Sequence, residues 1–376
     1  MLFVPPGAHP ENLCELFSME TGAHLFSPLP LRDLNFRNRI VVSPMCQYSS
    51  DDGFANDWHL VHLGSRAVGG AALVFTEAAA VLPDGRISPQ DLGIWKDAQT
   101  EMLARIFQFI EAQGAIAGVQ LAHAGRKAST GQPWKGGKPV SVADGGWTPI
   151  FAPSAVPFAD GYQVPQELNP GRIREISQAF AKAARRALQA GAKVIEVHAA
   201  HGYLLQSFLS PLSNRRTDDY GGSFENRIRF LCETVAAVRQ VWPEKYPLFV
   251  RISSTDWAEG GWTDDESVAL ATKLKSLGVD LIDCSSGGTV RGAKIPVGPG
   301  YQVRFAARIR HEAKIATGAV GMITSPEQAD EIVRLGQADL ILMAREFLRR
   351  PYWPIHAGAV LHQPPVPPPQ YLRAFQ

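Results

Sequence analysis

The stretch NPGRIREISQAFAKAARRALQAGAKVIEVHAA, residues 169–200, joins an amphipathic helix to a buried strand. Apolar residues such as Ile173, Ile176 and Phe180 recur at helical spacing through its first part. Gly191 stands where helices commonly end, and the run KVIEVHAA (193–200) is typical of a short strand buried on both faces. The stretch therefore predicts one helix–strand unit of an α/β fold.

The same unit repeats along the chain. Further strand-like runs occupy residues 39–44, 72–79, 116–123, 247–253, 281–287, 314–321 and 339–345. Helical patterns lie between several of them, at residues 97–114, 226–242, 263–278 and 325–337. Such alternation predicts parallel strands joined by crossovers, and eight units over roughly 310 residues predict a single closed (β/α)8 TIM barrel. A doubly wound open sheet is the alternative, but its glycine-rich turn is missing after the first strand, where the sequence reads SPMCQY.

Two segments depart from the repeat. Residues 124–168, after the third strand, form a long excursion rich in glycine, proline and tryptophan. A connection of that length is usually functional or carries a small structure of its own. The proline-rich residues 363–376 predict an extended C-terminal arm. We therefore expect an N-terminal extension over residues 1–24, a candidate for disorder, followed by a barrel over residues 25–362 and the arm.

Composition narrows the class of protein. The 376 residues are 45% hydrophobic and 19% charged with a net charge of +1, which argues against nucleic-acid and membrane-surface partners. No apolar run approaches the roughly 18 residues that span a bilayer, and the N-terminus does not resemble a signal peptide. No C-x-x-C pair occurs, so we expect reduced thiols and a cytoplasmic location for a chain whose cysteines are Cys14, Cys46, Cys232 and Cys284.

The first candidate site follows the fourth strand. Barrel active sites lie at the carboxyl ends of the strands, and side chains alternate along a strand. His198 therefore points into the barrel, with His201 and Tyr203 in the loop beyond. H-x-x-H supplies two ligands where a catalytic zinc needs three, and Glu77 is the candidate third. Metal binding and simple packing stay open, but the sequence favours hydrogen-bond donation to a substrate, with no metal.

A second group of polar residues faces the same cavity. Gln120 lies on the third strand and Arg251 on the fifth. A buried arginine needs an anionic or acceptor-rich partner, which is either a ligand or a salt bridge to Glu196 or Asp283.

The last two strands offer a site for an anion. Gly318 and Gly321 follow the seventh strand and Arg345 follows the eighth, where barrels commonly bind phosphate. Together with Gln120 and Arg251, they suit a phosphorylated planar cofactor.

Four motifs resemble one known family. They are SPMCQYSSDDG (43–53), LAHAGRKAS (121–129), VHAAHGYLLQSFLSPLSNRRTDDYGGSFENR (197–227) and TGAVG (317–321). They are similar to those of the old yellow enzymes, FMN-dependent ene-reductases, and the cysteine in SPMCQY is similar to that of the thermophilic-like class, which includes xenobiotic reductases. The resemblance runs from about residue 25 to the end of the chain. It implies FMN as cofactor, with NADPH or NADH as hydride donor.

The resemblance also implies roles for matching residues. The residues that would contact the flavin ring are Ser43, Pro44, Met45, Cys46, Ala78, Gln120 and Arg251. Those that would bind the FMN phosphate are Gly318, Gly321, Ala344 and Arg345. His198 and His201 would bind a substrate carbonyl, Tyr203 would donate a proton and Tyr48 would line the pocket. Arg373 would enter the substrate pocket of a partner subunit, in a homodimer or homotetramer.

The reaction that the resemblance implies is reduction of the C=C bond of α,β-unsaturated carbonyl compounds, and of nitro compounds. Two alternatives stay open at this stage. One is a non-redox barrel enzyme, an aldolase or hydrolase, acting on a phosphorylated substrate. A Schiff-base aldolase needs a lysine inside the barrel near a strand end, and the strand ends show none there, although Lys127 lies in the loop after the third strand. The other is a flavoprotein that serves in sensing or storage.

Overall fold

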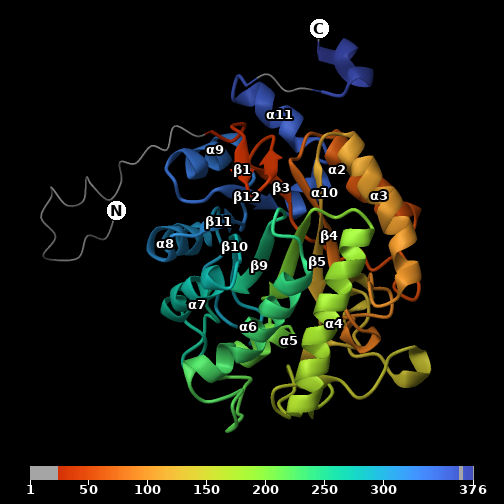
Figure 1. The fold of residues 1–376 in the computed structure, drawn as a ribbon, viewed down its shortest axis with the longest axis vertical. Coiled ribbons are helices and arrows are strands. Elements are labelled where there is room, and N and C mark those ends of the chain that lie inside the picture. Colours follow the sequence, from red (N-terminus) through yellow and green to blue (C-terminus); the bar gives the residue numbers. More distant parts are fainter. Residues whose placement is uncertain (1–23, 364–366, 376) are drawn as a thin grey trace, which may run out of the picture.

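The computed structural model describes residues 24–363 and 367–375, so the predicted N-terminal extension lies outside the described residues except for its last position. Eight parallel strands close into a barrel in the order β3, β4, β5, β8, β9, β10, β11, β12. Helices surround the strands (Figure 1). The predicted (β/α)8 barrel is confirmed.

All eight predicted strands are present. Each is a short run of residues with little or no exposure, as expected for parallel strands covered by helices on their outer side. Their bounds are β3 Ile40–Val42, β4 Leu73–Ala80, β5 Ile116–Ala122, β8 Val194–Ala199, β9 Leu248–Ser253, β10 Leu281–Ser285, β11 Ala316–Ala319 and β12 Leu340–Met343.

The five predicted helices are also present. They are α3 Thr100–Ala112, α4 Pro170–Gln189, α6 Phe224–Val241, α7 Asp264–Ser276 and α9 Pro326–Arg334. Several begin at a side-chain cap, such as Ser223 before α6 and Thr263 before α7. The sequence did not predict five further helices. Of these, α5 Leu204–Leu209, α10 Arg345–Arg349 and α11 Trp353–Val360 are short, whereas α2 Asp57–Val68 and α8 Val303–Ala313 are longer than α9.

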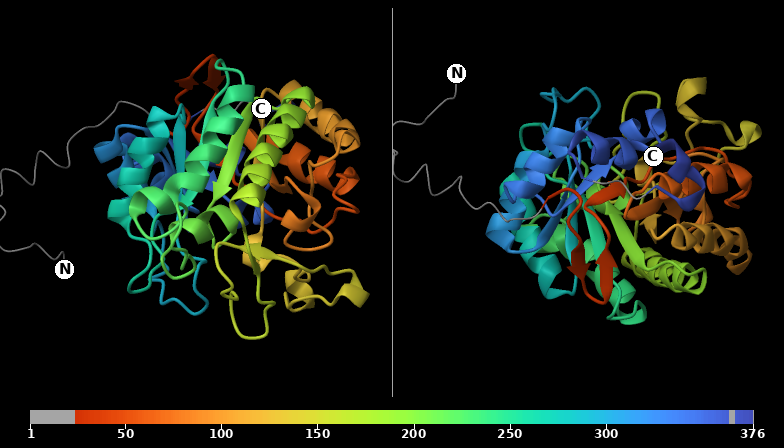
Figure 2. Two further views of the ribbon diagram at one scale, coloured as in Figure 1. Left: turned by 60° about the horizontal axis from the view of Figure 1, so that its bottom comes forward. Right: turned by 90° about the horizontal axis from the view of Figure 1, so that it is seen from above.

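Aromatic residues fill the amino-terminal end of the barrel. Phe36, from the hairpin of β1 (Leu29–Leu31) and β2 (Leu34–Phe36), stacks on Phe249 with ring centroids 6.5 Å apart. Phe75 also packs on Phe249, with ring centroids 6.1 Å apart. Gly118 admits the Phe75 ring, because a Cβ there would lie 2.7 Å from it. The hairpin covers this end (Figure 2, right), so the polar interior lies toward the opposite end.

The excursion after β5 carries its own small structure, as predicted. It contains the 3₁₀ turns η3 Gly125–Lys127, η4 Pro133–Lys135 and η5 Val142–Asp144, with the paired strands β6 Phe151–Ala152 and β7 Gln166–Glu167. Part of it extends away from the barrel (Figure 2, left).

The C-terminal arm differs from the prediction over residues 369–375, which form the 3₁₀ helix η6. Pro369 stands at its start, where its fixed φ is compatible with a helical turn, and no proline follows. Among the residues placed by the structure, none forms a helix both long and apolar enough to span a bilayer.

Candidate active site

Four polar side chains form a layer inside the barrel. Strand register places Gln120 beside Glu196, and Arg251 beside Asp283. Gln120 Nε2 donates to Glu196 Oε1 at 2.7 Å. Arg251 Nε lies 3.0 Å from Asp283 Oδ2, and its Nη1 donates to Ser43 Oγ at 3.0 Å. The sequence left open whether Arg251 pairs with a ligand or forms a salt bridge to Glu196 or Asp283, and the structure shows the salt bridge to Asp283.

His198, His201 and Tyr203 converge above this layer. The ring of His198 lies 5.1 Å from that of His201 and 5.0 Å from that of Tyr203, between centroids, and each pair of rings is nearly perpendicular. His198 is the register neighbour of Arg251, which sets it on the inner face at the carboxyl end of β8. Tyr203 precedes α5, whose start fixes its position. The structure therefore brings together the three residues that the sequence predicted.

The loop that carries His201 is held from three sides. His201 has a left-handed backbone with φ of 61°. Its N–H donates to Ser253 Oγ at 2.9 Å, its carbonyl accepts from Lys127 Nζ at 2.8 Å, and its Nε2 lies 2.7 Å from Ser285 Oγ. The loop packs on Gly288, where a Cβ would come within 2.5 Å of His201 Cα. These contacts stabilise a backbone conformation that non-glycine residues rarely adopt.

Burial sets the protonation of the three side chains. Desolvation, followed by the charges of Arg251 and Lys127, lowers the pKa of His198 well below its ordinary value, and the same causes act on His201. His198 Nδ1 accepts from the Ala200 N–H at 3.3 Å, so the neutral ring carries its proton on Nε2. Burial likewise raises the pKa of Tyr203 well above its ordinary value, so the phenol keeps its proton.

Lys127 is the cation closest to this group in the loop after β5. Its Nζ lies 5.1 Å from the ring centroid of Tyr203 and 4.4 Å from that of Phe158. Desolvation, and to a smaller extent Arg126, lowers the pKa of Lys127 to about 8. Its two hydrogen-bond acceptors are the carbonyls of His201 and Gly288.

The loop after β3 forms another wall. Tyr48 has φ of 50°, its carbonyl accepts from Gln132 Nε2 at 3.0 Å, and its ring meets Trp134 edge-on at 5.7 Å. Burial raises the pKa of the Cys46 thiol well above its ordinary value, so Cys46 is neutral. Pro44 and Met45 are half-buried in the same loop, and Ala78 is buried on β4.

Glu77, the candidate third metal ligand, has other partners. Its Oε2 accepts from the Gln47 N–H at 3.0 Å, and its Oε1 lies 3.2 Å from His59 Nε2. Over the described part of the chain, no three His, Cys, Asp or Glu side chains gather as a metal site would require.

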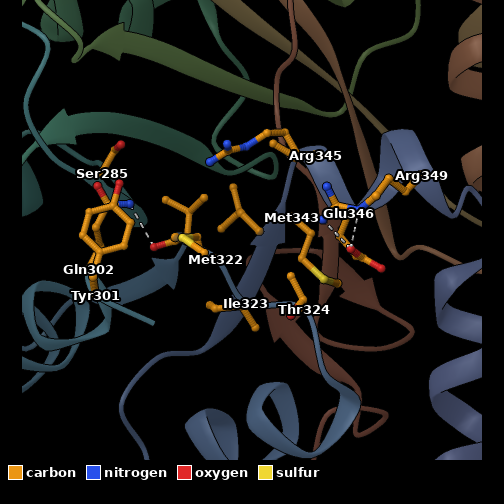
Figure 3. Close-up of a pocket in the computed structure, with 14 residues that line it drawn as sticks. Ser285, Tyr301, Gln302, Met322, Ile323, Thr324, Met343, Arg345, Glu346 and Arg349 are labelled. Atoms are coloured by element: carbon orange, nitrogen blue, oxygen red, sulfur yellow. Dashed lines mark hydrogen bonds and ion pairs between the residues drawn. The ribbon is translucent and has the colours of Figure 1, made fainter. Parts of the chain in front are cut away.

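A cavity of about 270 Å³ opens between β10, β11 and β12 (Figure 3). Arg345 extends into it toward Ser285 and Tyr301. Gly321 and Ala344 line it, whereas Gly318 is not among its lining residues. Gly318 packs inside the barrel, where a Cβ would lie 2.3 Å from Leu342 Cδ1. The other lining residues are Gln302, Val320, Met322, Ile323, Thr324, Leu342, Met343, Glu346 and Arg349.

The comparisons with known proteins decide the family. A model of the NADH:flavin oxidoreductase / NADH oxidase family matches residues 24–363. An NADPH dehydrogenase of Geobacillus sp. is 52% identical over 339 residues, which cover 90% of this chain and 94% of the relative. The chain belongs to this family.

Two solved structures agree. The old yellow enzyme homologue from Zymomonas mobilis has a TM-score of 0.76 and 25% identity, covering 92% of this chain and 94% of that one. Morphinone reductase in complex with tetrahydroNAD has a TM-score of 0.73 and 28% identity, covering 93% of each chain. The predicted membership of the old yellow enzyme family is confirmed, and with it an oxidoreductase that uses FMN and NADPH or NADH.

The residues present fit an old yellow enzyme's FMN. The side chain of Arg345 has no hydrogen-bond or ion-pair partner among the described residues, and it borders a cavity that Gly321 also lines. A cation without a protein partner beside such a cavity suits a phosphate. Gln120, Arg251 and Ser43 would face the ring, and Gly321, Ala344 and Arg345 would face the phosphate.

Several residues of the site escaped the sequence analysis. Ser253 and Ser285 hold His201, and Gln302 donates to the Val320 carbonyl at 3.0 Å beside the cavity. Serines at strand ends carry no motif of their own, and Gln302 precedes α8, a helix that the sequence did not predict. The nearest signal was position: Ser253 and Ser285 end β9 and β10.

Proposed function

We propose that this flavin oxidoreductase is an ene-reductase, which reduces the C=C bond of α,β-unsaturated carbonyl compounds. The observation that carries the proposal is the convergence of two neutral imidazoles, His198 and His201, with the protonated phenol of Tyr203. Hydrogen-bond donors and an acid side by side suit a substrate whose oxygen gains negative charge and whose carbon accepts a proton.

When bound, FMN supplies the hydride, which it receives from NADPH or NADH. His198 donates from Nε2 to the substrate carbonyl, and His201 donates from a ring nitrogen to the same oxygen. As the β-carbon accepts hydride, negative charge develops on that oxygen, and donors fixed in advance stabilise it by roughly 3 kcal/mol each. Because both rings are neutral, they donate without transferring a proton.

Tyr203 then protonates the α-carbon. Its phenol keeps its proton at neutral pH because burial raises its pKa. Lys127, 5.1 Å from its ring, favours the phenolate that forms as the proton leaves. The proton is regained from solvent after the product has formed.

The pocket wall and the arm complete the proposal. Tyr48 and Trp134 would flank the substrate, and Cys46 supports assignment to the thermophilic-like class. Arg373, on the exposed η6, would enter the pocket of a partner subunit in a homodimer or homotetramer. We also place the enzyme in the cytoplasm, on its thiols and composition.

Steady-state turnover tests the proposal. The purified protein should carry FMN that heat releases, and it should oxidise NADPH or NADH in the presence of 2-cyclohexenone to give the saturated ketone. Formation of the allylic alcohol, or oxidation of the nucleotide by oxygen alone with no consumption of enone, would overturn it. The second result would favour a flavoprotein that serves in sensing or storage.

A further inference from the structure

The polar layer under the proposed flavin site holds two carboxyls and one guanidinium. Glu196 and Asp283 are each 0% exposed. Arg251 is the cation whose charge acts on both carboxyls. Two ionised carboxylates with one guanidinium would leave an uncompensated negative charge in the interior of the barrel, which is strongly unfavourable.

The two carboxyls have different partners. Asp283 has the ion pair, with its Oδ2 3.0 Å from Arg251 Nε. Glu196 has only a neutral partner on its Oε1, the amide of Gln120. Ionisation is therefore favoured at Asp283 and disfavoured at Glu196.

Two carboxyl oxygens of this layer have no hydrogen-bond donor. Glu196 Oε2 and Asp283 Oδ1 are buried and receive no N–H or O–H from another described residue. Glu196 on β8 and Asp283 on β10 flank Arg251 on β9, and all three side chains face the interior of the barrel. A hydrogen bond between the two carboxyls is among the causes that raise the pKa of Glu196. A proton on Glu196 supplies the missing donor and satisfies both oxygens.

We propose that Glu196 carries a proton at neutral pH and donates it to Asp283, so that Arg251 faces one anion and not two. Glu196 is then a positioning residue for Arg251. Two further polar groups face this layer, Ser43 from the loop after β3 and His198 from β8. Burial, followed by the neighbouring Asp283, raises the pKa of Glu196, in agreement with this arrangement.

The consequence concerns the cofactor, and it rests on the proposed placement of FMN over Arg251. A reduced flavin carries negative charge that a nearby cation stabilises. A second carboxylate in the layer would cancel that effect. The protonated Glu196 therefore preserves the preference of the site for reduced over oxidised FMN.

Isosteric variants distinguish which of the two carboxyls carries the negative charge. Glu196→Gln keeps a neutral group that accepts from Gln120 and donates to Asp283, so the ratio of affinities for reduced and oxidised FMN should stay within about twofold of wild type. Asp283→Asn added to Glu196→Gln removes the anion beside Arg251 and leaves no second carboxyl to ionise in its place, so this double variant should raise that ratio about tenfold, which is about 30 mV for a two-electron couple. The flavin midpoint potential at pH 7 measures both. A tenfold rise in Glu196→Gln alone would overturn the inference, because Glu196 would then be ionised in the wild-type protein.

A second measurement does not depend on FMN. Infrared spectra of protein prepared with ¹³C-carboxyl glutamate should contain one carboxylic-acid C=O band that shifts in D₂O and is lost in Glu196→Gln. The spectrum is recorded on the protein as purified, with or without bound flavin. If the protein binds no flavin, the proposed function is wrong, but the protonation of Glu196 can still be tested. Absence of the band in folded wild-type protein overturns the inference even where the double variant does not fold.

Discussion

The ring centroids of His198 and His201 lie 5.1 Å apart, and the two rings are nearly perpendicular at 85°. Three residues apart in the chain, they are brought to one side of the barrel mouth by the left-handed backbone of His201. Donors that approach from two directions suit the two lone pairs of one carbonyl oxygen. The proposed chemistry depends on this relationship.

The first prediction concerns these two histidines. Replacing either by alanine should slow reoxidation of the reduced enzyme by an enone about 10²-fold to 10³-fold, because each variant loses one donor to the developing oxyanion. Phenol binding should weaken while FMN content is unchanged. Stopped-flow absorbance and phenol titration measure the effects. His311→Ala, on an exposed position of α8, is the control and should match wild type. Loss of bound zinc in place of these effects would support a metal site.

The second prediction concerns the proton donor. Tyr203→Phe removes the hydroxyl and keeps the ring, so the enone half-reaction should slow about 10²-fold to 10⁴-fold while reduction by NADPH keeps its rate. Tyr246→Phe, before β9 and packed on Trp242, is the matched control. Equal slowing of both half-reactions in Tyr203→Phe would indicate a distorted site and argue against a proton donor.

Much of this site follows from local sequence. The eight strands are short apolar runs, and their alternation alone places His198 on the inner face of β8 and Arg251 on that of β9. The contacts of His201 with Ser253 and Ser285, and the ion pair of Arg251 with Asp283, depend on the register of β8, β9 and β10. Because the register is set only when the barrel assembles, no local sequence pattern predicts those contacts. For the same reason the sequence left the partner of Arg251 open.

The third prediction concerns stability and pH. Burial lowers the pKa of Lys127 to about 8, below the ordinary value of 10.5, so the folded protein binds its proton less tightly than the unfolded chain does. Its charge therefore costs stability below pH 8, and the cost disappears as the pH rises from 8 toward 10.5. The Tm of Lys127→Met relative to wild type should accordingly fall between pH 7 and pH 10. Exposed Lys294→Met is the control and should give a constant difference. A difference for Lys127→Met that rises with pH would contradict the argument.

The fourth prediction concerns the arm. Tyr371, Leu372 and Phe375 are exposed on η6, an arrangement that favours docking on another subunit. Within the chain, Tyr371 contacts Tyr352 with ring centroids 6.0 Å apart. Truncation after Pro369 should loosen a dimer or larger assembly, measured by light scattering, and should impair enone turnover.

Arg373→Ala tests the arm more narrowly. It should raise the KM for the enone and leave the assembly intact, because only the proposed contact in the partner's pocket is lost. Arg350→Ala, exposed before α11, is the matched control. A truncated monomer with full activity would show that the arm has no role in the site.

The most direct test of the central claim is anaerobic reoxidation of the reduced enzyme. The protein is reduced with one equivalent of NADPH and mixed with 2-cyclohexenone, and flavin absorbance is followed while the products are counted. The account predicts full return of the oxidised spectrum, with one cyclohexanone formed per flavin. A flavin that stays reduced with the enone, yet is reoxidised at once when air is admitted, would contradict it.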